Sequence, residues 1–525
     1  MGIPSYFSYI IKNYSNIIRN YESVIGTPFH FLFMDCNSII YDAFRNIETQ
    51  HPDLLNDVGT LETEIINRVV SGIHEYVNYI KPSSLLYIAF DGVAPFAKME
   101  QQRIRRYKNS TSTPNTWSTS NITPGTPFMS KLSKKVYNVF TGLQQHYRVK
   151  NIIVSTSDEP GEGEHKMFQY IRDNLKCSMG EKCAVYGLDS DLIMLSLFHC
   201  KYFDSLYIFR ETPAFGKNLF PDTVELLDNE CHFLDIPLLA NCIVQELKCK
   251  YPDKHRIYDY VFLCFFLGND FLPHFPSLNI RTTGIDTLIQ TYTKLFGDFP
   301  EKYLISPSLE IQWRHVHNFV TELAKYEQDR FIGETTMREK WGNRTWDMNT
   351  ADGRDHLMQS VPVIYRCEES YIDPSHKFWQ NRYYMSLFGS DIPRKQICVN
   401  YLEGLEWVFR YYTQNCPHWQ WRYHYSYPPL LRDLVTHVPK TDFSFLNSDD
   451  STNKPFPSHI QLCYVLPKHQ HSLLPTKYQT LFAREYKDCF TDSFDYHWAF
   501  CRYLWEAHPI LPTISAETLA KWAKI

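Results

Sequence analysis

The segment Phe31-Leu32-Phe33-Met34-Asp35 is an apolar run of strand length that ends on a carboxylate. The same pattern returns at residues 85–91, which end on Asp91, and at residues 184–191, which end on Asp189-Ser190-Asp191. A short apolar run bounded by polar residues is typical of a strand buried in a parallel sheet. The sequence therefore predicts a sheet with acidic residues at the carboxyl ends of its strands, which is the edge where such sheets bind ligands.

The rest of the N-terminal half repeats this alternation of strand and helix. Strands are predicted at residues 31–34, 84–90, 151–155, 183–188 and 205–210. The clearest helix between them is residues 61–80, whose apolar side chains recur with helical spacing. Together these segments predict an α/β fold, with a mainly parallel sheet flanked by helices.

Further along the chain we expect three segments of different character. Residues 109–127 consist almost entirely of Ser, Thr, Asn and Pro and read as a surface loop, within which Trp117 stands out. Residues 254–267 form an apolar helix that leads into Gly268-Asn269-Asp270. The polar stretch at 342–355 marks a boundary, because Tyr, Trp and Pro become frequent after it. We predict two domains, residues 1–345 and the mostly helical residues 356–525.

Composition restricts the class of protein. The 525 residues carry a net charge of −5, so a nucleic acid would have to be bound by a local basic patch. The 14 cysteines are irregularly spaced without a C-x-x-C motif, which indicates reduced thiols inside the cell and no structural zinc site. The sequence shows neither a signal peptide nor an apolar stretch long enough to span a membrane. We expect an intracellular monomer, cytoplasmic rather than nuclear, without a membrane partner.

Seven carboxylates stand where apolar runs end or where a helix begins. They are Asp35, Asp91, Glu162, Glu164, Asp189, Asp191 and Asp270. One such residue is most often a helix cap or a turn former. Seven at one sheet edge would repel one another unless cations held them together, and oxygen-only clusters suit Mg²⁺ or Mn²⁺. The pattern therefore predicts a site for two divalent ions that hydrolyses phosphate esters.

A basic segment follows Asp91 directly. On a helix turning by about 100° per residue, four side chains from residues 98–106 fall within one sector. They are Lys98, Gln102, Arg105 and Arg106, whereas Arg103 points away. Such a face can bind a terminal phosphate, because Arg makes bidentate contacts to phosphate oxygens. The alternative is a solvated basic face without a ligand.

Aromatic and histidine residues give weaker signals. Tyr41, Trp419 and Trp421 are candidates for stacking on nucleic-acid bases, although ordinary core packing explains such rings equally well. His165 follows Glu164, and His274 follows Asp270 by four residues. We expect both histidines to pack or to support other side chains, since a hydrolase with two metal ions needs no histidine base.

Long motifs in a fixed order resemble the Xrn-type 5′→3′ exoribonucleases. The opening Met-Gly-Ile-Pro-Ser-Tyr-Phe, the segment Pro160-Gly161-Glu162-Gly163-Glu164-His165-Lys166 and the segment Gly268-Asn269-Asp270-Phe271-Leu272-Pro273-His274 are examples. Further similar segments are residues 34–37, 90–95, 98–106, 122–126, 187–194, 383–389, 401–407, 474–478 and 509–512. The resemblance therefore extends over nearly the whole chain.

This resemblance implies a nuclease core similar to PIN and flap nucleases in residues 1–345, braced by residues 356–525. It implies processive release of 5′-mononucleotides from single-stranded RNA with a 5′-monophosphate. The seven carboxylates would bind Mg²⁺ or Mn²⁺, and Lys98, Gln102, Arg105 and Arg106 would bind the 5′-phosphate. The family stacks the terminal base between a His and a Trp. Here Tyr41 occupies the His position, and Trp419 or Trp421 is the Trp.

Two alternatives remain open from the sequence. A flap-type DNA nuclease shares the Met-Gly start, the carboxylates and the basic helix, but it would cut branched DNA and release oligonucleotides. A non-enzymatic RNA-binding scaffold would bind RNA without turnover. We expect a short form that consists of the nuclease core alone, for which the sequence identifies no protein partner.

Overall fold

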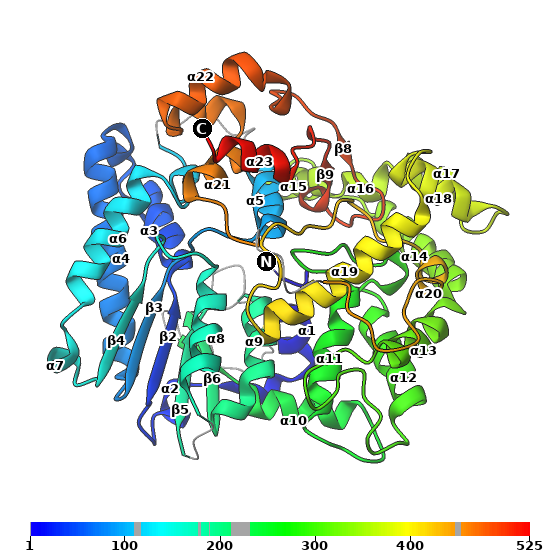
Figure 1. The fold of residues 1–525 in the computed structure, drawn as a ribbon, viewed down its shortest axis with the longest axis horizontal. Helices are drawn as coiled ribbons and strands as arrows, with labels where there is room; N and C mark the ends of the chain where they lie inside the picture. Colours follow the sequence, from blue (N-terminus) through cyan, green and yellow to red (C-terminus); the bar gives the residue numbers. More distant parts are fainter. Residues whose placement is uncertain (1, 110–116, 177–179, 188, 212–230, 447–452) are drawn as a thin grey trace.

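The computed structural model describes residues 2–109, 117–176, 180–187, 189–211, 231–446 and 453–525 (Figure 1). These residues form a seven-stranded sheet in the order β1-β7-β6-β5-β2-β3-β4. The strands are β1 Ile18–Arg19, β2 Phe31–Asp35, β3 Leu85–Ala89, β4 Asn151–Ser155, β5 Lys182–Tyr186, β6 Ser205–Glu211 and β7 Cys231–Asp235. All five predicted strands are confirmed, whereas the short edge strand β1 and its neighbour β7 were not predicted.

The sheet is mainly parallel, as predicted. Strands β6, β5, β2, β3 and β4 run in the same direction, while β7 is antiparallel to β6 and β1 is antiparallel to β7. The chain proceeds from β2 to β3 and β4 on one side and then returns to β5 on the other side of β2. The order therefore reverses between β2 and β5, which is the position where open parallel sheets bind ligands.

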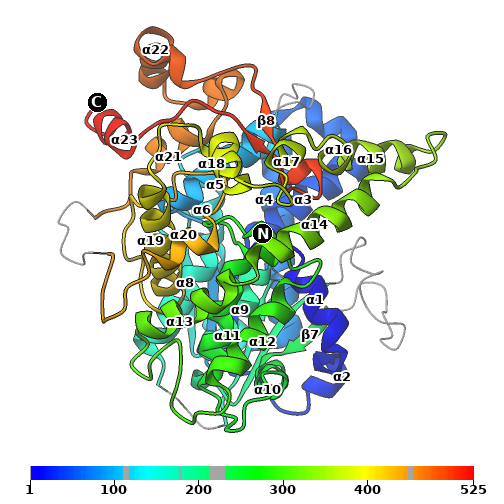
Figure 2. The same ribbon diagram turned by 90° about the vertical axis from the view of Figure 1, so that its right-hand side faces the viewer.

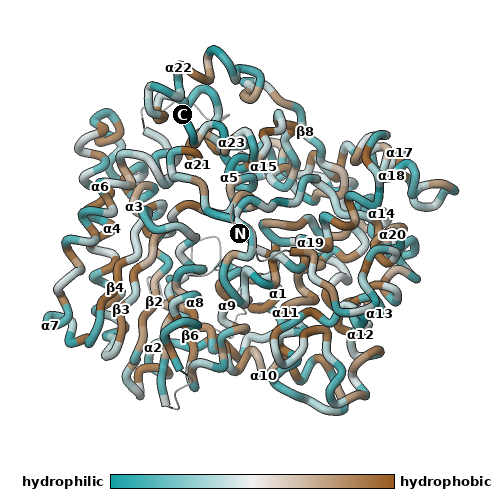
Figure 3. The backbone as a smooth tube through the Cα atoms, in the orientation of Figure 1, coloured by the Kyte–Doolittle hydropathy of each residue, from teal (hydrophilic) through white to brown (hydrophobic). Residues whose placement is uncertain are grey.

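Helices cover both faces of the sheet because successive side chains of a strand point to opposite sides. Phe31 and Phe33 of β2 enter one hydrophobic core, and Leu32 and Met34 enter the other. One face is covered by α3 Asn37–Gln50, α4 Val58–Ile80 and α6 Pro127–Phe140. The other is covered by α1 Tyr6–Asn13, α8 Gly163–Asn174, α9 Ser190–His199, α10 Ile236–Glu246 and α11 Arg256–Cys264. Hydrophobic residues recur along the strands and at intervals along these helices (Figure 3).

The C-terminal half is helical, as expected. Its helices are α12 Gly284–Phe296, α13 Trp313–Ala324, α14 Glu327–Gly342, α15 Ala351–Gln359, α16 Val361–Ile364, α17 Cys367–Ile372, α18 Trp379–Phe388, α19 Arg394–Thr413, α20 Leu431–Val435, α21 Ser458–Val465, α22 Thr476–Glu485 and α23 Ala516–Trp522. A small sheet pairs β8 Tyr496–His497 with β9 His508–Pro509. Figure 2 turns the molecule so that α10 to α13 face the viewer.

Helix α19 lies in the core that covers one face of the sheet. Its residues 397–413 are buried almost all round, which is typical of a central helix. Its side chains share that core with α9 and α11. The helical half therefore packs directly against the helices that follow the strands.

The remaining helices in the N-terminal half are α2 Tyr21–Val24, α5 Phe96–Asn109 and α7 Gln144–Tyr147. Helix α5 carries the predicted basic face, and its apolar residues Phe96 and Met99 pack with α21 and α23 (Figure 1). The predicted helices at 61–80 and 254–267 are confirmed, the second as α11 followed by a 3-10 turn at Phe265–Leu267. None of the helices that the structure describes has both the length and the hydrophobicity needed to cross a bilayer.

The prediction of a surface loop over residues 109–127 is wrong where the structure describes this segment; residues 110–116 lie outside the described part. Trp117 is only 3% exposed, with its ring centroid 4.6 Å from Phe44 and 5.5 Å from Phe128. Ser120 and Thr123 are also buried, and both accept hydrogen bonds from Arg106. Polar side chains can be buried here because they have hydrogen-bond partners.

We expect the substitution Trp117→Ala to lower the free energy of unfolding by about 3–5 kcal/mol, because it leaves a cavity between α3 and α6. Chemical denaturation followed by circular dichroism measures this change. Trp505, which is 47% exposed, offers the control, since Trp505→Ala removes a ring of the same size from the surface. Equal stability of the two variants would contradict the burial of Trp117.

Candidate active site

The carboxyl ends of three neighbouring strands bring acidic residues to one edge of the sheet. Asp35 is the last residue of β2, and Asp91 follows β3 by two residues. Asp189 follows β5 and stands at the N-cap of α9, and Asp191 lies in the first turn of that helix. Since β2 pairs in parallel with both β3 and β5, the structure places these residues together as the sequence predicted.

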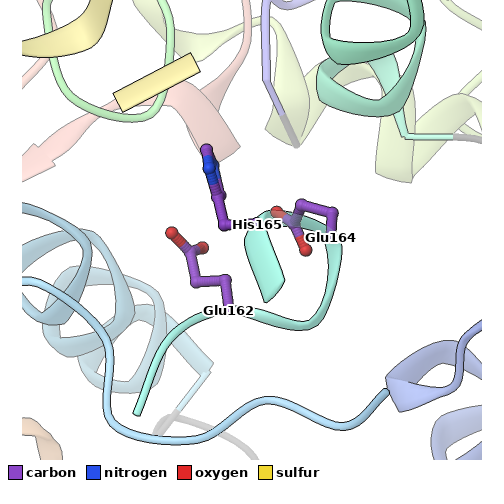
Figure 4. Close-up of side chains that lie close together, drawn as sticks. All are labelled: Glu162, Glu164 and His165. Atoms are coloured by element: carbon purple, nitrogen blue, oxygen red, sulfur yellow. The ribbon is translucent and has the colours of Figure 1, made fainter. Parts of the chain in front are cut away.

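The start of α8 supplies two more acids. Glu162 is the N-cap residue of α8 and Glu164 lies in its first turn, so their side chains flank Gly163 (Figure 4). The amide of Gly163 donates a hydrogen bond of 2.8 Å to Asp91 Oδ1. A Cβ atom at this position would lie 2.6 Å from Asp35 Oδ1, so a side chain here would displace the Asp35 carboxylate. Glycine therefore allows the helix to approach the strand ends.

Two groups of side chains could hold a metal ion. Ligand atoms of Asp35, Asp91 and Glu164 lie within 4.8 Å of one another, and so do those of Glu162, Glu164 and His165. Asp35 Oδ1 is buried without a hydrogen-bond partner among the described residues. Three carboxylates with an unpaired oxygen fit Mg²⁺ or Mn²⁺, which prefer oxygen ligands.

Burial makes this arrangement of charges costly. Burial, together with the charges of Asp91 and Asp189, raises the pKa of Asp35 well above its ordinary value. Burial and the charges of Glu162 and Asp35 do the same for the pKa of Glu164. Carboxylates in this state bind a cation readily, because a cation offsets both the lost hydration and the mutual repulsion.

Lys98 is the cation that the chain itself contributes to this cluster. Its Nζ atom lies 2.5 Å from Glu162 Oε2 and 2.8 Å from Asp270 Oδ2. Burial alone would raise the pKa of Asp270, but nearby positive charges, with Lys98 first and Arg105 among them, together outweigh burial and lower that pKa to about 2. The structure thus places Lys98 among the acids, at the end of α5 nearest the sheet.

The other polar residues of α5 have different surroundings. The Gln102 side-chain oxygen accepts a 3.0 Å hydrogen bond from Gln461, and Arg103 points away to the carbonyl oxygen of Pro512, 2.9 Å from its guanidinium. Arg106 is buried and donates to Ser120 and Thr123, and burial lowers its pKa to about 10. Arg105 is half-buried and has no hydrogen-bond or ion-pair partner among the residues that the structure describes.

Asp270 reaches the cluster through a sharp turn. Gly268, which follows the 3-10 turn after α11, has a φ of 82°, and a Cβ atom there would lie 2.6 Å from the amide nitrogen of His274. The side chain of Asn269 accepts hydrogen bonds of 2.9 Å from the amides of Phe271 and Leu272. Burial lowers the pKa of His274 to about 4, so this histidine is neutral within the turn at neutral pH.

The three aromatic candidates are not equivalent. Trp421 is 8% exposed, and its ring stacks on Trp407 at 5.3 Å. Trp419 is half-buried, and its carbonyl oxygen accepts a 2.8 Å hydrogen bond from the amide of Phe96 at the start of α5. Tyr41 lies on α3 and is half-buried against the core that α3 shares with α4 and α6.

Three residues in contact with the acids were not predicted. The side chain of Asn37 donates to Asp91 Oδ2, and its oxygen accepts a 3.1 Å hydrogen bond from the Asp91 amide. The hydroxyl of Tyr411 donates to Glu162 Oε1 at 2.8 Å, and that of Tyr412 donates to Asp191 Oδ1. Asn37 could have been found from its position two residues after Asp35. The tyrosines lie more than 200 residues from their partners and give no local signal.

The fold and the site together define an α/β protein with a cluster of acids, able to bind a metal ion, at the switch point of a mainly parallel sheet. Residues 1–212 match the family described as "XRN 5′-3′ exonuclease N-terminus". Residues 250–373 and 375–524 match the family described as "Xrn1 helical domain". The chain belongs to the XRN 5′-3′ exonuclease family.

Individual relatives resemble the chain over most of its length. It is 26% identical to 5′-3′ exoribonuclease 1 of Schizosaccharomyces pombe, over 99% of this chain and 48% of the relative. It is 25% identical to 5′-3′ exoribonuclease 1 of Homo sapiens, over 92% of this chain and 32% of the relative. It is also 25% identical to 5′-3′ exoribonuclease 2 of Arabidopsis thaliana, over 100% of this chain and 67% of the relative. The chain thus spans about half of the fission yeast protein and a third of the human one.

Among solved structures, "The catalytic core of Rad2 in complex with DNA substrate (complex III)" matches with a TM-score of 0.31 and 17% identity. The match covers 56% of this chain and 70% of that one. A superposition at this score does not bear on the fold or the function of this chain.

We expect Gly163→Ala to weaken metal binding at least about tenfold, because the added Cβ atom displaces the Asp35 carboxylate while the helix itself tolerates alanine. Titration of the protein with Mn²⁺ in the absence of nucleic acid measures the affinity. Gly333→Ala is the matched control, since that exposed glycine in α14 has no atom within 4 Å of an added Cβ. Parental affinity in Gly163→Ala would contradict the placement of Asp35 as a ligand.

Proposed function

We propose that this chain is a divalent-metal-dependent 5′→3′ exoribonuclease. It removes mononucleotides from single-stranded RNA that carries a 5′-monophosphate. One observation supports this most strongly. In a chain of the XRN family, ligand atoms of Asp35, Asp91 and Glu164 lie within 4.8 Å of one another. Beside them, Lys98 of α5 pairs with the acids Glu162 and Asp270. The acids provide a site for phosphodiester hydrolysis, and the cations provide a site for the end of the strand.

The seven carboxylates are the proposed metal ligands. Asp35, Asp91 and Glu164 would hold one ion, and the remaining four acids would hold a second ion nearby. Bound Mg²⁺ or Mn²⁺ neutralises charge on the scissile phosphate and makes an attacking water more acidic. The side chain of Asn37 and the backbone amide of Gly163 fix the orientation of Asp91, so this acid is aligned before RNA binds.

The proposed 5′-phosphate pocket is formed by Lys98, Gln102, Arg105 and Arg106. Arg105 supports this assignment best, because its guanidinium has no partner among the described residues and can make bidentate contacts to phosphate. The hydroxyls of Ser120 and Thr123 hold Arg106 in place. Lys98 of the same helix contacts Glu162 and Asp270, so end recognition would lie next to the site of cleavage.

For base stacking we propose Tyr41 together with Trp419. Trp421 is a poorer candidate because its ring already stacks on Trp407 and is almost fully buried. Trp419 is half-buried and is held by a backbone hydrogen bond at the first residue of α5. We also propose residues 356–525 as a second domain that braces the site, since Tyr411 and Tyr412 contact its acids.

We expect Glu162→Gln and Asp191→Asn each to abolish hydrolysis while RNA binding persists, because each substitution removes a metal ligand and leaves the cations of α5. The rate is measured with Mg²⁺ and 5′-monophosphate single-stranded RNA, and binding is measured in EDTA. Glu301→Gln, which neutralises an exposed acid, is the control. Full activity in either site variant would disprove the metal assignment.

The same assay distinguishes the alternatives. The exoribonuclease releases mononucleotides from RNA and leaves matched DNA and a branched flap substrate intact. Oligonucleotides released from the flap would identify a structure-specific DNA nuclease instead. RNA binding by the parent protein without any product would identify a scaffold.

We expect Arg105→Ala to reduce the preference for 5′-monophosphate over 5′-hydroxyl RNA by about 10- to 100-fold, because a charge-assisted contact of about 1.5–3 kcal/mol is lost. Adding Arg106→Ala should reduce the preference further. The ratio of initial rates on the two RNAs is the measurement, and the exposed pair Lys134→Ala and Lys135→Ala is the control for charge. Equal rates on both RNAs in the parent protein would remove the basis for this pocket.

A further inference from the structure

Helix α19 directs two neighbouring hydroxyl groups at two different acids of the candidate active site. Tyr411 donates to Glu162 Oε1 at 2.8 Å, and Tyr412 donates to Asp191 Oδ1. The two acids belong to different elements, since Glu162 precedes α8 and Asp191 lies in the first turn of α9. Consecutive residues on a helix point about 100° apart, so one helix can reach both acids at once.

The position of α19 does not depend on these two hydrogen bonds. Trp407, one turn before Tyr411, packs edge-to-face on Phe271 with a centroid distance of 4.9 Å and stacks on Trp421. The rings themselves are also packed, because His165 stacks on Tyr411 at 3.6 Å and Tyr412 meets Phe265 at 5.4 Å. Core packing therefore fixes the rings, and the rings fix the hydroxyls.

Each hydroxyl engages one specific oxygen of its carboxylate. In Glu162 the Tyr411 hydroxyl engages Oε1, while Lys98 engages Oε2. A phenol has an ordinary pKa of about 10 and remains a donor at neutral pH. Hydrogen bonds to a charged acceptor are stronger than those between neutral groups, so one such bond can select one rotamer of a buried acid.

We propose that Tyr411 and Tyr412 are positioning residues that orient Glu162 and Asp191 for divalent-metal binding, so that the helical half of the chain completes the metal site. This inference rests on the proposed function. Neither tyrosine needs to touch RNA or the ions. Each holds one carboxylate oxygen and thereby restricts the rotation of its acid. Partners of this kind commonly change metal affinity by about 10- to 100-fold.

The test is the affinity of RNA-free protein for Mn²⁺, measured for Tyr411→Phe and Tyr412→Phe separately. Phenylalanine retains the ring and its packing and removes only the hydroxyl. We expect Mn²⁺ to bind about 10- to 100-fold more weakly to each variant, while affinity for RNA in EDTA stays at the parental value. In the hydrolysis assay, raising the Mg²⁺ concentration should restore most of the lost rate, which a general defect in structure would not allow.

Tyr383→Phe is the matched control. Tyr383 is also fully buried, and its hydroxyl donates a 2.9 Å hydrogen bond to the carbonyl oxygen of Pro428, with no acid involved. This variant should bind Mn²⁺ like the parent protein. The rise in unfolding temperature on adding Mn²⁺ provides a second measurement, and it should be smaller for the two site variants than for Tyr383→Phe.

The outcomes separate this inference from the proposed function. Parental Mn²⁺ affinity in both Tyr411→Phe and Tyr412→Phe would overturn the positioning role, even if the parent protein degrades RNA. An equal loss of affinity in Tyr383→Phe would also overturn it, because the effect would then follow from any lost buried hydroxyl. A parent protein that binds Mn²⁺ without degrading RNA would instead refute the exoribonuclease assignment and leave the positioning role standing.

Discussion

Repulsion among carboxylates at the ends of β2, β3 and β5 is the constraint on which the rest of the structure depends. Asp35 and, on α8, Glu164 are half-buried and lie close to other acids, so their charges must be offset. The partners described above come from four elements: Asn37 from α3, the Gly163 amide from α8, Lys98 from α5 and two hydroxyls from α19. The acidic cluster is therefore possible only when the sheet, the basic helix and the helical half are assembled around it.

This requirement explains why the two halves of the chain share a core. Helix α19 packs with α9 and α11, the helices that carry or precede Asp191 and Asp270. Helix α5 packs its apolar face on α21 and α23 and turns Lys98 toward the acids. The C-terminal helices thus hold both the cations and the hydroxyl donors in place, and a change in their packing would alter the charge balance at the sheet edge.

The strands and the acids could be predicted from the sequence because both signals are local. A short apolar run identifies a buried strand, and β2, β3, β4, β5 and β6 all follow from such runs. The runs of β2, β3 and β5 also lead into an Asp residue. β1 has only two residues, too few for any periodicity. Trp117 was misplaced because composition cannot show that Ser120 and Thr123 have a buried partner in Arg106. The helical spacing of residues 98–106 predicts a basic face on α5. Only the tertiary structure shows that Lys98 of this face contacts Glu162 and Asp270.

Helix α5 has one more consequence. It is rigid, and it carries Lys98 at the acids and Arg105 two turns further along. Seven residues of helix span about 10 Å, a length that neither thermal motion nor RNA sequence can change appreciably. Under the proposed function, this helix fixes the distance between the residues that bind the 5′ end of the RNA and the site of cleavage. An insertion of one residue between Lys98 and Arg105 would turn Arg105 by about 100° relative to Lys98. The length of α5 should therefore be far less tolerant of change than its exposed side chains.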